Sequence, residues 1–242
     1  MSAAVAASQR EVLTALLREL AQKAGRGEAP LAIFDLDDTL LSTAARNLRI
    51  LREFAAQAGG RWEEAERLRG LSAERLRYSI LDSAREAGLE RPELLAELRR
   101  FWRERFFTND YLASDEPVPG AAEFCADLLA AGARLAFLSG RDESMRPGTE
   151  SSLRRHGLGA EGAALILKPS FDTPDMEFKS QALARLPALG AVAAAFENEP
   201  AHVNLFAQTF PKARVFLLET KHSGKPILPH ARVRAIKDFR RC

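Results

Sequence analysis

The chain has 242 residues, of which 46% are hydrophobic and 28% are charged, and this composition excludes disordered and fibrous proteins. Its 35 basic and 33 acidic residues nearly balance, and the net charge of +2 gives no reason to expect the strongly basic surface that nucleic-acid binding needs. The length suits one large domain or a domain with an insertion.

The first predicted elements are a helix and a buried strand. Apolar residues at helical spacing predict an amphipathic helix from Ser8 to Ala24, and the segment 25–30 interrupts it with glycine and proline. The apolar run 31–34 then predicts a buried strand. It ends abruptly in the carboxylates of Asp35, Asp37 and Asp38.

A long helical segment follows, from Thr43 to about Asp115. It is rich in Arg, Glu, Ala and Leu, it shows no convincing strand, and its glycines predict a division into three or four helices. Near its start, Arg46, Asn47 and Arg49 either meet a substrate or form an exposed helix face. We expect its aromatic residues to form its own hydrophobic core; they are Trp62, Phe101, Trp102, Phe106 and Phe107.

Helices and strands alternate from Pro117 onward. The predicted helices are 121–131, 150–156, 179–186 and 201–210, and the predicted strands are 134–138, 163–167, 191–196 and 215–218. This alternation predicts an α/β fold, with a Rossmann-like parallel sheet core and helices on both faces. We expect residues 1–42 and 117–242 to form that core, and residues 43–116 to be an inserted all-helical cap that closes over the ligand edge of the sheet.

The carboxylates after the first strand are costly neighbours. Like charges this close repel each other unless a cation or hydrogen-bond donors hold them. A hard cation such as Mg²⁺, which prefers oxygen ligands and often binds phosphate as well, would compensate them. The alternative interpretation is a strand that leads into an Asp-rich helix cap.

Polar residues also follow three other predicted strands. Ser139, Gly140 and Arg141 follow the second strand, Lys168 and Lys179 come after the third, and the fourth ends in Glu197-Asn198-Glu199. The carboxyl ends of parallel strands lie along one edge of a sheet, so we expect these groups to converge. Gly140 would let the main chain approach an anion closely.

These four groups, in this order, resemble the motifs of the haloacid dehalogenase superfamily of aspartate-nucleophile phosphohydrolases. The family has a strand that ends in Asp-x-Asp-x-Thr, then a hydroxyl, a lysine and an acidic strand end. Here Asp35-Leu36-Asp37-Asp38-Thr39, Ser139, one of the two lysines, and Glu197 match them. The likeness extends over nearly the whole chain, and the helical insertion corresponds to the family's C1 type of cap.

The resemblance implies a role for each matched residue. Asp35 would attack phosphorus and form an aspartyl-phosphate, and Asp37 would protonate the leaving oxygen and later deprotonate water. Mg²⁺ would be bound by Asp35, the main-chain carbonyl of Asp37, and Glu197. Ser139 and a lysine would bind the other phosphoryl oxygens.

Further residues are candidates for contact with the substrate, and two assignments stay open. Thr39, Gly140 and Arg141 are expected to bind substrate. Lys179 is the preferred lysine because it is predicted to open a helix after a loop, and Lys168 is its rival. Relatives often carry Asp-Asp at the fourth strand end, where this chain has Glu197-Asn198; Glu197, Asn198 or Glu199 could therefore complete the metal site.

The resulting hypothesis is a Mg²⁺-dependent phosphatase that acts on a small phosphate monoester. The alternatives are a phosphotransferase or mutase, and a catalytically weak binding protein that keeps the fold. A haloacid dehalogenase is disfavoured, because that reaction needs no acid and relatives that perform it lack a carboxylate at the position of Asp37.

The expected partner is a small phosphorylated metabolite, with no nucleic acid and no membrane, and the sequence leaves the oligomeric state open. No window approaches the roughly 20 apolar residues of a membrane span, and Arg10 and Glu11 interrupt the N-terminal segment early. Cys125 and Cys242 are far apart and are expected to be reduced thiols. We therefore expect a cytoplasmic location.

Overall fold

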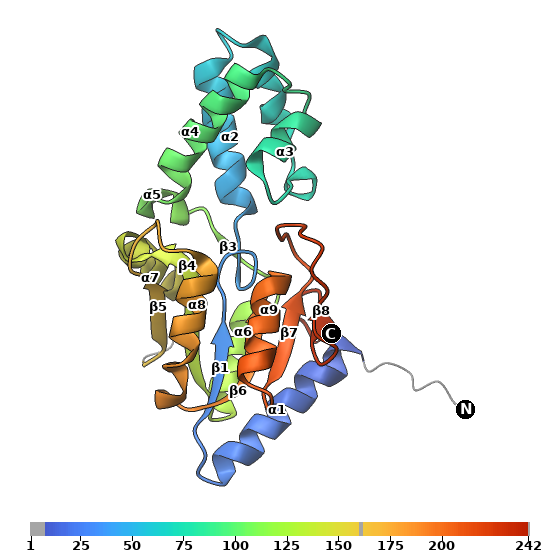
Figure 1. Ribbon diagram of the computed structural model, residues 1–242, viewed down its shortest axis with the longest axis vertical. Helices are drawn as coiled ribbons and strands as arrows, with labels where there is room; N and C mark the ends of the chain where they lie inside the picture. The colour runs from blue at the N-terminus through green and yellow to red at the C-terminus, as the bar shows by residue number, and fades with distance from the viewer. Residues whose placement is uncertain (1–7, 160–161, 242) are drawn as a thin grey trace, which may run out of the picture.

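The computed structural model describes residues 8–159 and 162–241. Among them, six parallel strands form one sheet in the order β5-β4-β1-β6-β7-β8 (Figure 1). The strands are β1 Pro30–Phe34, β4 Arg134–Asp142, β5 Ala164–Lys168, β6 Ala191–Glu197, β7 Arg214–Leu218 and β8 Arg234–Ile236. The helices that accompany the sheet are α1 Gln9–Gly25, α6 Ala121–Ala130, α7 Arg146–Arg155, α8 Asp175–Leu183 and α9 Pro200–Thr209. The α/β fold with helices on both faces is as predicted.

Strand β1 lies inside the sheet between β4 and β6, and every one of its residues is buried. Phe34 is in register with Phe137 of β4 on one side and Phe196 of β6 on the other. The amide of Asp35 continues this pairing by donating to the carbonyl of Phe196 at 3.0 Å. The carboxyl ends of β1, β4 and β6 therefore lie side by side, as the sequence predicts.

Alternate residues of β1 pack on opposite faces of the sheet. The side chains of Ala32 and Phe34 lie on the face that α1 and α6 cover. Those of Leu31 and Ile33 lie on the face that α8 and α9 cover. On the first face the rings of Phe34 and Phe196 stack at 4.5 Å between centroids. This two-sided packing fixes the position of the loop that follows β1.

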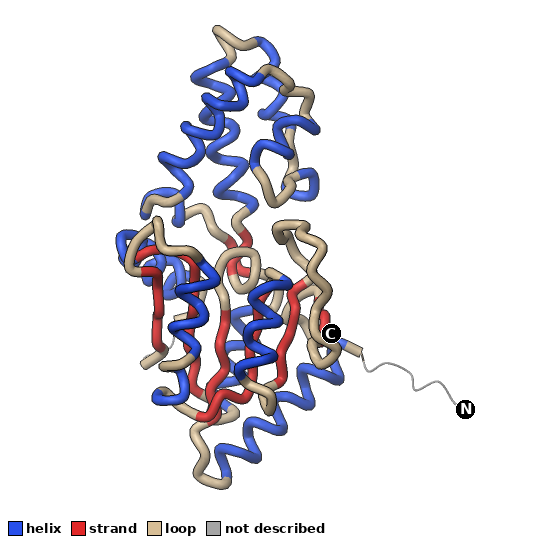
Figure 2. Tube along the Cα trace, viewed as in Figure 1, coloured by secondary structure: helices blue, strands red, loops and turns tan. Residues whose placement is uncertain are grey.

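The insertion between β1 and β4 is helical and has a separate hydrophobic core. It contains α2 Ala44–Ala58, α3 Ile80–Glu86, α4 Pro92–Phe106 and α5 Asn109–Leu112, with two 3-10 helices, Glu63–Gly70 and Ala73–Arg75. It stands above the carboxyl edge of the sheet, and Figure 2 shows the strands of the sheet confined to the other half of the molecule. A short antiparallel pair, β2 Leu41–Ser42 and β3 Glu116–Pro117, lies where the chain enters and leaves the insertion. The exact division at 42/43 and 116/117 into core and cap stays a prediction.

Several element boundaries differ from the sequence predictions. Helix α8 begins at Asp175, after Pro174 at its N-cap, so Lys179 lies in its second turn and does not open it. Helix α7 begins at Arg146, since Pro147 favours the first turn of a helix. Strand β8 was not predicted, because it has only three residues and follows a loop rich in polar residues.

The cysteines and the helix lengths bear on two other predictions. Cys125 is a free thiol buried in the core, and burial raises its pKa to about 12. Cys242 lies outside the described residues. None of the described helices combines the length and the apolar character that crossing a membrane requires.

The central position of β1 leads to a prediction about stability. Replacing Phe34, which is fully buried, by alanine should lower the free energy of unfolding by about 3–5 kcal/mol. The substitution leaves a cavity between the rings of Phe137 and Phe196, on the face of the sheet that α1 and α6 cover. Denaturant titration measures this change. Leu228, which is 87% exposed, is the control, and Leu228→Ala should change the same quantity by less than about 0.5 kcal/mol. Equal effects of the two substitutions would contradict the packing described.

Candidate active site

The loop after β1 places its carboxylates in different surroundings. Asp35 is buried directly at the strand end, and Asp37 is partly open. Asp38 has a φ of 57°, a left-handed conformation that aspartate tolerates better than most residues. Its carboxylate accepts bonds from the amide and hydroxyl of Thr43, with the amide at 3.0 Å. These bonds hold the loop against the first turn of the insertion.

A buried ammonium group joins the first and fourth strand ends. Nζ of Lys179 lies 2.9 Å from Oδ1 of Asp35 and 2.6 Å from Oε2 of Glu197. All three side chains are at least nine-tenths buried. Burial and the charge of Glu197 raise the pKa of Asp35, whereas Lys179 holds the pKa of Glu197 below its usual value in spite of burial. One buried cation thus faces two buried carboxylates.

Asp37 belongs to a second cluster, which contains two arginines. Its Oδ1 accepts bonds from Arg46 at 2.9 Å and from Arg141 at 2.5 Å. Both guanidinium groups also bind Asp115, which lies just before β3, at 2.6 and 2.7 Å. Burial acts to raise the pKa of Asp37, but Arg141 and Arg46 outweigh it and hold that pKa well below its usual range. The carboxylate is therefore kept charged.

From the sequence, Arg46, Asn47 and Arg49 either contact a substrate or form an exposed helix face. Arg46 is fully buried and Asn47 is nearly so, which rules out an exposed face for both. Arg49 is exposed and pairs with Glu53 one turn further along α2. Sequence reasoning missed Asp115 as the partner of Arg46, because 69 residues separate them.

The strand end of β4 supplies a hydroxyl and a close turn of main chain. Ser139 is fully buried, and its Oγ accepts from the amide of Arg141 at 3.3 Å. A Cβ added at Gly140 would lie 3.2 Å from a carboxylate oxygen of Asp175, so a larger residue would crowd the start of α8. Ser139, Gly140 and Arg141 all line the same cavity as Asp35.

The fourth strand end uses its polar side chains to fix loops. Oε1 of Glu197 accepts from the amides of Asn198 and Glu199, each at 3.0 Å. The carboxylate of Glu199 accepts from the amide and the hydroxyl of Ser223 at 2.9 and 2.7 Å. Both residues nevertheless line the cavity, as does Asn198.

Two predicted residues occupy positions that differ from the expectation. Thr39 is fully buried and is not among the residues that line the cavity, and its hydroxyl donates to Asn198 at 3.2 Å. It therefore positions Asn198, and contact of Thr39 with substrate stays a prediction. Lys168 pairs with Asp175 at 2.9 Å and lies outside the lining, which leaves Lys179 as the lysine beside Asp35.

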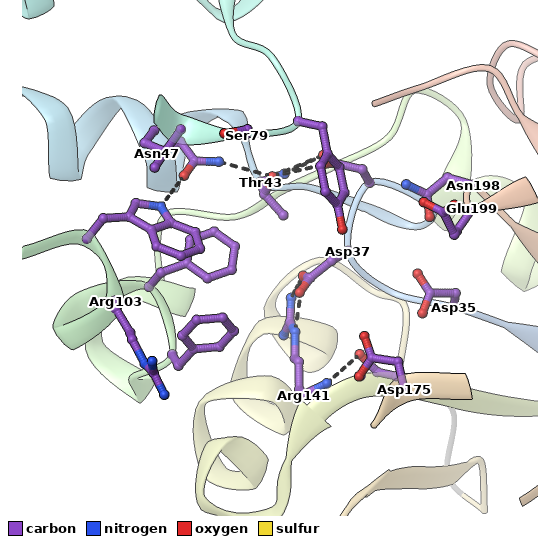
Figure 3. A pocket seen from close by; sticks show the side chains of 18 of the residues that line it. Asp35, Asp37, Thr43, Asn47, Ser79, Arg103, Arg141, Asp175, Asn198 and Glu199 are labelled. Carbon is purple, nitrogen blue, oxygen red and sulfur yellow. Dashed lines mark hydrogen bonds and ion pairs between the residues drawn. The ribbon is translucent and has the colours of Figure 1, made fainter. Parts of the chain in front are cut away.

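A cavity of about 570 Å³ joins these groups to the insertion. Asp35, Asn198 and Glu199 lie on one side of Figure 3, and Asn47 and Arg103 of the insertion lie on the other. Trp102 and Phe106 pack against the insertion's core, as predicted, and they also line the cavity. Phe107 lines the cavity, and Phe101 is buried in the core. The sequence analysis assigned no site role to Tyr78, Phe171 or His202, which also line the cavity. Nδ1 of His202 lies 3.7 Å from Oε2 of Glu197.

The donor set suits a hard divalent cation. Of the two carboxylate oxygens of Asp35, only Oδ1 accepts a hydrogen bond from Lys179. Neither Oδ2 of Asp35 nor the main-chain carbonyl of Asp37 accepts a hydrogen bond from the described part of the chain. No group of three or more His, Cys, Asp and Glu residues suited to a metal occurs within residues 8–159 and 162–241. Mg²⁺ needs no such cage, since one or two carboxylates, waters and a substrate phosphate commonly hold it.

A family model agrees with the order of these residues. Residues 32–198, more than half of the chain, match the model of the haloacid dehalogenase-like hydrolases. No curated protein matches the sequence.

Solved structures with the same fold are similar over most of their length. A haloacid dehalogenase superfamily hydrolase of subfamily IA, variant 1, from Geobacter sulfurreducens has a TM-score of 0.54 and 15% identity, and the match covers 88% of this chain and 93% of that one. A haloacid dehalogenase-like family hydrolase from Streptococcus pneumoniae has a TM-score of 0.53 and 13% identity, over 86% and 94%. Protein Tyrosine Kinase A of Mycobacterium tuberculosis has a TM-score of 0.51 and 21% identity, over 86% and 93%. At these identities the likeness establishes the fold alone.

The buried arginine cluster leads to a prediction about stability. Replacing Arg46 by methionine leaves Asp37 and Asp115 with one cation between them and should lower the free energy of unfolding by about 3 kcal/mol or more. Urea titration followed by circular dichroism measures it. Arg52 lies exposed on the same helix, and Arg52→Met should change the value by less than about 0.5 kcal/mol. A similar small change in both variants would show that the cluster adds no stability.

Proposed function

This chain belongs to the haloacid dehalogenase-like hydrolase family, and we propose that it is a Mg²⁺-dependent phosphatase that hydrolyses a small phosphate monoester through a phosphorylated Asp35. The observation that supports this most is the position of Asp35. Its carboxylate lies at the cavity with one oxygen bound to Lys179, and the other accepts no hydrogen bond from residues 8–159 and 162–241. A carboxylate in that state can act as a nucleophile.

In the first step, the free oxygen of Asp35 forms a bond to phosphorus while the bond from phosphorus to the ester oxygen breaks. Asp37, which lines the same cavity, gives a proton to the leaving oxygen and becomes a carboxylate, so it has to enter this step protonated. Lys179 and Ser139 lie where positive charge and a hydroxyl can bind phosphoryl oxygens. The product of this step is an aspartyl-phosphate and a free alcohol or phenol.

In the second step, Asp37 removes a proton from water, and the water oxygen attacks phosphorus. The bond between phosphorus and Asp35 breaks, which restores the carboxylate and frees inorganic phosphate. Arg46 and Arg141 keep Asp37 charged, and a charged carboxylate is the form that a base requires. The observed arrangement is therefore better suited to the second step than to the first.

The negative charge of the site explains the need for Mg²⁺. Asp35, the carbonyl of Asp37, and Glu197 are the residues that would hold the ion. When bound, it offsets the charge of nucleophile and phosphate. The residues of the chain otherwise position Asp35 and bind the phosphoryl oxygens.

The insertion supports a small substrate rather than a macromolecule. It contributes residues from α2, α3 and α4 to the cavity, which therefore lies between the insertion and the sheet edge. A volume of about 570 Å³ accommodates a metabolite. A phosphorylated protein would have to displace the insertion.

The role of Asp35 is tested by an isosteric substitution. With Mg²⁺, the unchanged chain should release phosphate from an aryl phosphate, and Asp35→Asn should lower kcat by about 10⁴-fold or more, because the amide is not a nucleophile. Asp172→Asn, at an exposed carboxylate outside the cavity lining, is the matched control and should keep full activity. Phosphate release measured by colorimetry gives both values.

A second readout does not depend on turnover. Beryllium fluoride with Mg²⁺ mimics an aspartyl-phosphate, so it should raise the melting temperature of the unchanged chain and leave that of Asp35→Asn where it was. No turnover over a broad panel of phosphate esters, together with no thermal shift, would contradict the proposal and favour a binding protein.

The two lysines can be separated by matched substitutions. Lys179→Met should lower kcat/KM by about 10²–10³-fold, because it removes the donor beside Asp35, whereas Lys168→Met should retain most of the activity. Circular dichroism checks that both variants are folded. The opposite ranking would show that Lys168 is the lysine that binds phosphate.

A further inference from the structure

Four aromatic rings form a continuous wall on the insertion side of the cavity. Trp102 and Phe106 stack at 4.5 Å between centroids, and Phe107 meets both edge-on at 5.5 and 5.0 Å. Phe171, from the loop after β5, meets Phe107 edge-on at 4.8 Å. We call these four residues the aromatic wall. All of them line the cavity that contains Asp35.

Two rings of the aromatic wall are held by contacts with polar side chains. The indole nitrogen of Trp102 donates to Oδ1 of Asn47 at 2.7 Å. The guanidinium of Arg46 lies 4.2 Å from the centroid of Phe106 and is itself held by Asp37 and Asp115. The aromatic wall is therefore a preformed apolar surface in a cavity whose lining also includes the charged residues Asp35, Asp37 and Lys179.

Two arginines border the aromatic wall. Arg99 and Arg103 are one turn apart on α4, and both line the cavity. Many arginines of the insertion pair with a carboxylate, as Arg61 does with Glu97, but in the described part of the chain neither Arg99 nor Arg103 has an ion-pair partner. Arg103 lies 4.7 Å above the centroid of Phe171. A cation in that position can receive an anion without first losing a partner.

We propose that the substrate's leaving group is a planar aromatic ring that carries a second negative charge, such as a carboxylate. The ring packs on the aromatic wall, and Arg103 with Arg99 binds the anionic substituent, while the phosphate lies at Asp35. Aromatic rings pair favourably with such a surface, and arginine binds a carboxylate through two parallel donors. The inference rests on the proposed function of the same site, which it narrows to one class of ester.

The test uses phosphonates, which the chain cannot hydrolyse, and measures the dissociation constant by calorimetry in the presence of Mg²⁺. Phenylphosphonate should bind about tenfold more tightly than propylphosphonate, and 4-carboxyphenylphosphonate about tenfold more tightly again, since each gain reflects one added contact. Equal affinity of the phenyl and propyl compounds would overturn the role of the aromatic wall.

The position of the ligand is checked by fluorescence. The chain has two tryptophans, so Trp102 is the one tryptophan left in Trp62→Phe. With excitation that selects tryptophan over tyrosine, 4-carboxyphenylphosphonate should change its emission. Phe107→Leu, which removes the ring in the middle of the aromatic wall, should reduce the advantage of phenyl over propyl. Unchanged emission on saturation would place the ring elsewhere and overturn the proposal.

Arginine variants test the anionic contact. Arg103→Met should abolish the advantage of the carboxylated compound over phenylphosphonate, and Arg99→Met should reduce it. Arg100 is exposed on the same helix and does not line the cavity, so Arg100→Met is the matched control and should leave the advantage intact. A carboxylate advantage that survives in both Arg103→Met and Arg99→Met would overturn this contact.

Failure of this inference is distinguishable from failure of the proposed function. Release of phosphate from alkyl esters, without the predicted order of phosphonate affinities, would overturn the inference and leave the phosphatase in place. The predicted order of affinities without turnover of any ester would support the ligand class and contradict the phosphatase.

Discussion

The bond of one buried lysine to two carboxylates is the interaction on which the site depends. The register of β1 against β6 brings Asp35 and Glu197 to the same edge, where both carboxylates are buried and their charges repel each other. Lys179 reaches both from the second turn of α8, on the face of the sheet that α8 covers. Because α8 packs its apolar residues against the same strands, the position of the cation follows from the position of the helix. The surroundings of Asp35 are thus fixed by core packing and not by a flexible loop.

A second set of charges connects the insertion to the sheet. Arg46 lies in the first turn of α2, and it binds Asp37 in the loop after β1, Asp115 at the exit of the insertion, and the carbonyl of Phe106 at 3.2 Å. One side chain therefore ties the entry, the exit and helix α4 to the loop after β1. Movement of the insertion as a body would have to break these buried bonds or carry Asp37 with it. The state of Asp37 and the position of the insertion are accordingly coupled.

The sequence predicted the groups that stand at strand ends, because the geometry of a parallel sheet brings them together whatever the details. Asp35, Ser139 and Glu197 belong to this class, and the structure places all three at one cavity. The sequence could not predict that Arg46 binds Asp115 or that Trp102 lines the cavity. Helical periodicity shows that one face of a helix is apolar, but it does not show what that face contacts. Lys179 was preferred over Lys168 although the start of α8 was misplaced by four residues, from 179 to 175. The stated reason for that preference, that Lys179 opens a helix, does not hold, and the order of motifs alone would have left both lysines open.

The glutamate at the fourth strand end shows how a departure from the usual family pattern can be accommodated. Its extra methylene lets one carboxylate oxygen reach Lys179 while the other accepts the amides of Asn198 and Glu199. Asn198 is bound in turn by Thr39 and by the carbonyl of Lys221, so its uncharged side chain joins the first motif to the loop after β7. A second carboxylate at this position would face the carbonyl of Lys221 with no proton to donate, and it would add charge to a pocket that already holds several acids. An amide is the side chain of similar size that satisfies both contacts, which explains why Glu197 is followed by asparagine here.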